Sequence, residues 1–144
     1  MAIPLARKVV IDTNLFIDYL RDDLFAEWVF GRPGLAIRFL SSIVLMELGL
    51  GANTPKRRRA VDRIRAAFPD ERVVAPSPDL FLRAAFLFRR LYGGGSEPTD
   101  RLGPINDLLI ALTAWRIGAA VLTQNTKDFQ RIQAQLPGLR IVSP

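Results

Sequence analysis

The chain has 144 residues, with 20 Lys and Arg against 14 Asp and Glu, and carries a net charge of +6. It contains no cysteine and no histidine, which excludes disulfides, thiolate zinc sites, iron–sulfur clusters, imidazole ligands and histidine-dependent triads. Any metal ion must therefore be bound mainly by oxygen, which favours Mg²⁺, Mn²⁺ or Ca²⁺. The length and the 49% of hydrophobic residues predict one globular domain over residues 1–144.

In chain order, we expect a strand at 8–11, a helix at 14–20, a strand at 35–40, a helix from Ser41 or Ser42 through 48, and a helix at 55–68. There follow a strand at 72–75, a helix at 78–92 capped by Ser77, a glycine-rich loop at 93–98, a helix at 105–117, a strand at 119–123, a helical segment at 127–135 and a strand at 139–142. This alternation predicts an α/β fold with three layers, α/β/α, around a central, mostly parallel sheet.

The basic charge favours a polyanionic partner, of which nucleic acid is the simplest, although a solubilising surface charge explains it equally well. No uncharged run approaches the roughly 18 residues of a membrane helix. The first ten residues lack the apolar stretch and cleavage site of a secretory signal. We therefore expect a cytoplasmic protein with no membrane partner.

Four acidic residues lie at strand ends or inside apolar segments. Asp12 directly follows the strand at 8–11, at the end of the strands where open α/β sheets bind ligands, although a helix cap explains it as well. Glu47 has apolar or small neighbours on both sides, in a segment where burial of an unpaired carboxylate is costly. Asp107 opens an apolar helix, whose dipole would stabilise it. Asp128 follows the strand at 119–123 and is expected to cap or enter the next helix.

A parallel sheet brings such positions to one edge, so the four acids are expected to converge. Converging carboxylates repel one another strongly unless a counter-charge is present. A hard divalent cation supplies that charge, prefers oxygen ligands and can activate water for displacement at phosphorus. The pattern therefore predicts a metal-dependent phosphodiester hydrolase, and the basic excess would help its anionic substrate to approach an acidic cleft.

Four segments together closely resemble the motifs of PIN-domain nucleases. They are 9–14 (VVIDTN), 47–51 (ELGLG), 106–111 (NDLLIA) and 122–129 (LTQNTKDF). Their acids follow the order of the family's motifs, at separations of 35, 60 and 21 residues. The resemblance covers nearly the whole chain, and the short length looks like that of the VapC-type toxins of toxin–antitoxin pairs.

The resemblance implies an endoribonuclease that depends on Mg²⁺ or Mn²⁺, binds a cognate antitoxin and forms a homodimer. Asp12, Glu47 and Asp107 would be its catalytic, metal-binding acids. Water activated at this site would attack the RNA phosphodiester and leave a 5′-phosphate and a 3′-hydroxyl. The number of metal ions, one or two, stays open.

The fourth motif leaves two candidates for the fourth acidic position, Asn125 and Asp128. Asp128 is preferred as the catalytic and metal-binding residue, because an asparagine would be a weaker ligand. Hydrogen-bonding residues that hold the acids or the water would be Thr13, Asn14, Thr123 and Asn125.

Six positive charges lie within the ten residues 56–65. The candidates for contact with the RNA backbone are Lys56, Arg57, Arg58 and Arg59, and such contacts would depend strongly on salt. A solvated helix face explains these charges equally well. Further along the chain, Phe81, Phe86 and Phe88 are expected in the core.

Other phosphate-binding classes are excluded by specific residues. The chain has no G-x-x-x-x-G-K-[ST] sequence, and Gly49-Leu50-Gly51 lacks the third glycine of a dinucleotide-binding loop. The remaining alternative is a PIN-like subunit that binds nucleic acid together with its antitoxin and represses its own operon, with little or no cleavage.

Overall fold

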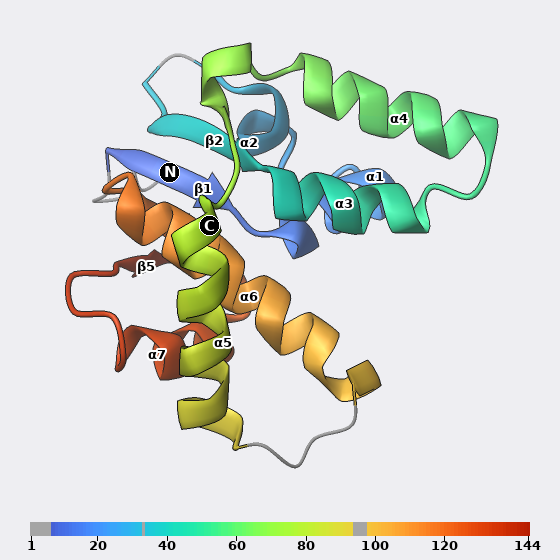
Figure 1. Ribbon diagram of the computed structural model, residues 1–144. Helices are drawn as coiled ribbons and strands as arrows, with labels where there is room; N and C mark the ends of the chain where they lie inside the picture. Colours follow the sequence, from blue (N-terminus) through green and yellow to red (C-terminus); the bar gives the residue numbers. More distant parts are fainter. Residues whose placement is uncertain (1–6, 33, 94–97) are drawn as a thin grey trace.

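The computed structural model describes residues 7–32, 34–93 and 98–144, which form a parallel sheet between two layers of helices (Figure 1). The sheet order is β3-β2-β1-β4-β5, and every neighbouring pair is parallel. The strands are β1 Lys8–Ile11, β2 Ile37–Ser41, β3 Val73–Val74, β4 Ala120–Leu122 and β5 Ile141–Val142. The predicted three-layer α/β/α fold is confirmed.

The helices that connect β1 to β2 and β2 to β3 lie on one face of the sheet. Those that connect β3 to β4 and β4 to β5 lie on the other. The first group is α1 Thr13–Asp22, α2 Ala26–Phe30, α3 Ser42–Gly51 and α4 Pro55–Ala66. The second group is α5 Pro78–Tyr92, α6 Pro98–Arg116 and α7 Thr126–Gln133. Figure 1 shows the two groups on opposite sides of the sheet. None of the helices in the described part of the chain has the length and hydrophobicity that a membrane crossing requires.

Strand β1 is the centre of the sheet, and its position determines where the site forms. Its residues Val9 to Ile11 are fully buried, as is the whole of β4. Register pairs Val10 with Phe39 of β2 and with Val121 of β4. The carboxyl ends of these strands therefore lie side by side, as the sequence predicted.

The start of α6 and the capping of α5 differ from the prediction. Helix α6 begins at Pro98, seven residues before the expected start at 105, and carries Pro104 inside it. Ser77 occupies the cap position of α5, but its side chain accepts no hydrogen bond from the helix and its hydroxyl instead donates to Asp79. By contrast, Ser41 caps α3 as expected, with its Oγ accepting from the amide of Ile43 at 3.1 Å.

Helix α5 is less buried than predicted. Phe88 lies in the core, whereas the expectation that Phe81 and Phe86 do so is wrong, because their side chains are 50% and 63% exposed. The buried stripe of the helix consists of Leu80, Ala84, Leu87 and Phe88, and the other two phenylalanines lie outside it. Of the predicted loop at 93–98, residues 94–97 lie outside the described residues. The single domain over residues 1–144 stays a prediction.

Arg38 on β2 connects α2 with the residues that follow α4. Its guanidinium donates to the carbonyls of Trp28 at 2.9 Å and Val29 at 2.7 Å in α2, and to that of Ala67 at 3.1 Å just after α4. It also lies over the ring of Phe68, with its Cζ 4.2 Å from the ring centroid. One cation thus satisfies carbonyls at the ends of two helices, which would otherwise have no intrahelical partner.

We expect Arg38→Ala to lower the free energy of unfolding by about 2–4 kcal/mol, because three carbonyls lose their donor and the Phe68 ring loses packing. Urea denaturation monitored by circular dichroism measures this change. Arg58→Ala removes an exposed cation from α4 and should change the free energy by less than about 0.5 kcal/mol. Equal effects of the two substitutions would contradict a structural role for Arg38.

Candidate functional site

Asp12 lies directly after β1 and is buried. Its Oδ1 accepts from the amide of Thr13 at 2.8 Å, and its Oδ2 accepts from the hydroxyl of Thr123 at 2.7 Å. It is also the N-cap residue of α1, so the same residue can both cap the helix and belong to the site. Burial raises the pKa of Asp12; the hydrogen bonds from Thr123 and Thr13 lower it, and the nearby charge of Glu47 raises it.

Glu47 on α3 reaches the same region through Thr13. The Thr13 hydroxyl donates to Glu47 Oε1 at 2.8 Å, while its amide donates to Asp12. Thr13 therefore joins two of the predicted acids from separate elements. Glu47 is half-buried, so its carboxylate keeps access to solvent.

Asp107 lies in the middle of α6, and not in its first turn as predicted, because the helix begins at residue 98. The dipole of the helix N-terminus therefore does not explain its position. Burial and the charges of Asp12, Glu47 and Asp128 raise its pKa to about 7. All three predicted partner acids are thus close enough to influence Asp107.

The fourth motif forms one hydrogen-bonded unit and does not separate Asn125 from Asp128. The Asn125 side-chain amide donates to Asp128 Oδ2 at 2.8 Å. The Asn125 backbone amide donates to the Thr123 hydroxyl at 2.9 Å, which in turn donates to Asp12. Asn125 and Asp128 are both exposed at the start of α7. A continuous chain of contacts thus runs from Asp128 to Asp12.

Asn14 is the remaining polar residue predicted at this site. Its Oδ1 is buried and has no hydrogen-bond partner within the described residues. A buried amide oxygen without a donor is costly. Such an atom is the kind of group that a bound water or cation satisfies.

The donor set fits a hard divalent cation, although the carboxylates do not converge on one point. In the described part of the chain, no three acidic side chains are placed to hold a single ion together, even though four acids share one electrostatic environment. Mg²⁺ is commonly held by one or two carboxylates with water completing its coordination. Asp12 and Asp107 suit that mode, because both are acids whose pKa burial raises and for which a cation would supply counter-charge.

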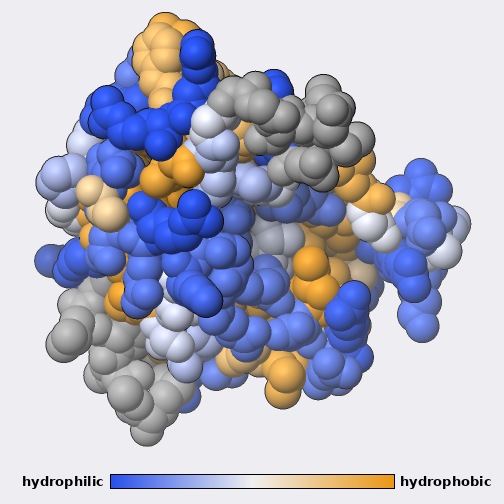
Figure 2. Space-filling model, turned by 90° about the horizontal axis from the view of Figure 1, so that it is seen from below, coloured by the Kyte–Doolittle hydropathy of each residue, from blue (hydrophilic) through white to orange (hydrophobic). Residues whose placement is uncertain are grey.

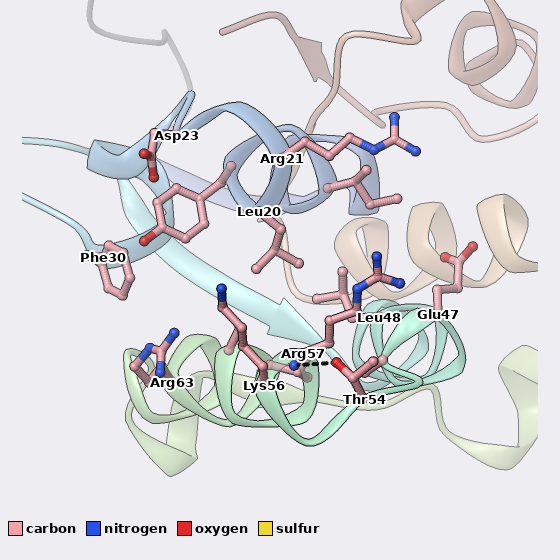
Figure 3. Close-up of a pocket in the computed structure, with 16 residues that line it drawn as sticks. Leu20, Arg21, Asp23, Phe30, Glu47, Leu48, Thr54, Lys56, Arg57 and Arg63 are labelled. Carbon is pink, nitrogen blue, oxygen red and sulfur yellow. Dashed lines mark hydrogen bonds between the residues drawn. The ribbon is translucent and has the colours of Figure 1, made fainter.

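A groove of about 820 Å³ extends from Glu47 between α1 and α4. Figure 3 shows Arg21 and Arg57 extending toward the end of this groove where Glu47 lies. Of the predicted substrate-binding residues, Lys56 and Arg57 line the groove, whereas Arg58 and Arg59 are exposed outside its lining. Sequence reasoning missed Arg21, because it lies on a different helix and no local pattern connects it with α4.

Comparison with known proteins identifies the family. Residues 9–135 match the family model of the PIN domain. The chain belongs to the PIN-domain family. PIN domains are generally nucleases that use divalent metal ions, and the predicted family resemblance is confirmed.

Solved structures of toxin–antitoxin complexes contain chains with a similar fold. DNA-bound VapBC from Salmonella typhimurium has a TM-score of 0.62 and 21% identity, covering 94% of this chain and 97% of that one. VapBC2 from Rickettsia felis, bound to a DNA fragment from their promoter, has a TM-score of 0.61 and 18% identity, covering 95% and 98%. VapBC-1 from nontypeable Haemophilus influenzae has a TM-score of 0.60 and 24% identity, covering 94% and 97%. Among curated proteins, the search finds no match.

The raised pKa of Asp107 predicts that the metal-free protein loses stability as pH rises. The folded state holds a proton on Asp107 up to about pH 7, whereas the unfolded state releases it near 3.8. The contribution of protonated Asp107 to the free energy of unfolding is fully present below the pKa of the unfolded state. It disappears as pH rises through the pKa of the folded state. Asp107→Asn should therefore remove part of the decline.

Urea denaturation in EDTA at about pH 5 and about pH 8 measures this decline. Asp62→Asn, which changes an exposed acid on α4, should retain the wild-type dependence. A decline that persists unchanged in Asp107→Asn would contradict the assignment.

Proposed function

We propose that this PIN-domain protein is a Mg²⁺- or Mn²⁺-dependent endoribonuclease and the toxin of a toxin–antitoxin pair. The observation that carries the proposal is the chain of hydrogen bonds that joins three acids from separate segments, Asp12, Glu47 and Asp128. Asp107 lies close enough for the charges of all three to raise its pKa. Acids in a shared, partly buried site need a counter-charge. A divalent cation would supply it and would act as a Lewis acid for phosphodiester hydrolysis.

The chain's own residues have distinct roles in this proposal. Asp12 and Asp107 would bind the cation, since burial raises the pKa of both and a cation would supply the missing counter-charge. Glu47 would orient the attacking water, because it is half-buried and held by the Thr13 hydroxyl at 2.8 Å. Asp128 would assist from the exposed rim, held by Asn125. The products would carry a 5′-phosphate and a 3′-hydroxyl.

Lys56 and Arg57 in the groove, with Arg58 and Arg59 beside them, would bind the RNA backbone. Their charges offset the acids, which alone would repel a polyanion. The groove joins the acid cluster at Glu47, so a strand bound along it would pass the cleavage site. Binding through such contacts weakens as salt increases.

The toxin role is supported by the relatives of similar fold, which include VapBC toxin–antitoxin complexes. Their fold spans more than nine-tenths of this chain. We therefore propose a cognate antitoxin as the protein partner. The homodimer stays a prediction of the family resemblance.

Cleavage of a defined single-stranded RNA tests the activity. Wild type should cleave with Mg²⁺ or Mn²⁺ and stop in EDTA, and Asp107→Asn should lower the rate by more than about 100-fold. Asp62→Asn is the matched control and should cleave normally. A wild type that cleaves with neither metal, yet binds operon DNA with its antitoxin, would favour the nucleic-acid-binding alternative.

Thr123→Val tests how Asp12 is held. Valine is close to threonine in shape but cannot donate to Asp12 Oδ2, so we expect about 10–100-fold weaker Mn²⁺ binding or activity. Calorimetric titration with Mn²⁺ measures the first quantity and RNA cleavage the second. Unchanged values for both would show that the hydrogen bond has no part in the site.

A further inference from the structure

A second cationic feature lies on α7, on the face of the sheet opposite to α4 (Figure 1). Arg131 on α7 lies over the ring of Tyr92, the last residue of α5, with its Cζ 4.9 Å from the ring centroid. Phe88 supports the same ring, with centroids 5.1 Å apart. Figure 1 shows α7 beside the C-terminal half of α5. Neither Arg131 nor Tyr92 stood out in the sequence.

Helix periodicity places this pair beside the proposed site. Arg131 follows Asp128 by three residues on α7, so the two side chains share one face of the helix. Tyr92 is near the acids as well: burial raises the pKa of Tyr92, the Arg131 charge lowers it, and the charges of Asp128 and Asp107 raise it. The pair therefore borders the acid cluster.

Arg131 is exposed, so its guanidinium is accessible to a ligand in solution. Across the described residues, the salt bridges are those of Arg65 with Asp70 and of Arg116 with Asp79, so Arg131 is in neither. A guanidinium stacked on an aromatic ring is held flat, and its N–H donors remain available at the edge. Figure 2 shows mostly hydrophilic residues on the face seen from the lower end of α5, with hydrophobic residues in separate patches.

Resting on the proposed nuclease function, we propose that Arg131 binds a phosphate of the RNA strand adjacent to the one that is cleaved, and that Tyr92 positions Arg131 for this contact. Phosphate recognition by arginine uses the edge of the guanidinium, which the stacking leaves open. The strand would then be held on both sides of the acids, by Lys56 and Arg57 on one side and by Arg131 on the other.

The chain contains a matched pair that separates substrate binding from packing. Arg83 on α5 lies over Trp115 on α6, with its Cζ 4.6 Å from the ring centroid. Trp115 is eight residues beyond Asp107, about 12 Å along the helix. Arg83→Gln therefore removes the same charge and the same kind of contact, but away from the acids.

The experiment measures the affinity of a short, fluorescent single-stranded RNA as a function of salt, in the non-cleaving Asp107→Asn background with Mg²⁺. Arg131→Gln should weaken binding about 10-fold and reduce the slope of log K against log salt by about 0.7, the value for one phosphate contact on a single strand. Arg83→Gln should change neither. Tyr92→Leu should act in the same direction as Arg131→Gln, whereas Tyr92→Phe, which keeps the ring, should bind normally.

Further readouts separate the possible failures. If Arg131→Gln and Arg83→Gln have equal effects on affinity and slope, or if Arg131→Gln weakens Mn²⁺ binding without affecting RNA affinity, the inference is wrong. Thermal unfolding checks that each variant is folded. Wild-type cleavage with Mg²⁺ is measured separately: if it occurs, an unchanged Arg131→Gln overturns only this inference. If wild type cleaves with neither metal, the proposed function fails and the inference fails with it.

Discussion

The parallel pairing of β1 with β4 is the constraint on which the site depends. Register places Ile11 opposite Leu122, and the amide of Asp12 donates to the Leu122 carbonyl at 2.9 Å. The next residues along the two strands, Asp12 and Thr123, are thereby brought within hydrogen-bond distance although 111 positions separate them. Thr13 then extends the contact to Glu47. Backbone hydrogen bonds of the sheet thus fix the positions from which the acids project.

The charges of the four acids and of the surrounding cations determine what this arrangement can bind. Asp12 has a structural explanation as the N-cap of α1, but the mutual repulsion of the four acids does not favour folding. It is tolerated because sheet and helix packing hold the backbone in place, a pattern typical of functional sites. Cations occupy separate elements around the acids, on α4 and on α7, and not within the cluster. A polyanion can therefore be attracted to the rim while the centre stays free to bind a positive charge.

Local pattern predicted the strand at 8–11 and the helix at 78–92 with their observed bounds, because β-branched runs and a Ser-Pro start are strong local signals. The predicted start of α6 at residue 105 is wrong, because the helix continues through Pro104 although proline is normally disfavoured inside a helix. The exposure of Phe81 and Phe86 depends on which side of α5 meets α6, which periodicity alone does not specify. The four acids were identifiable through the order of the motifs. Contacts such as Arg131 with Tyr92 were not, because they join distant segments without a shared pattern.

Arg38 has a consequence for the groove beside Glu47. It binds the end of α2, whose Phe30 lines one wall, and the end of α4, whose Arg63 lines the other. The distance between the two walls at that end is therefore set by a residue in the sheet before any molecule enters. A groove that is rigid in advance loses little conformational entropy when it is filled. Discrimination there should depend on the shape of the incoming molecule rather than on adjustment of the protein.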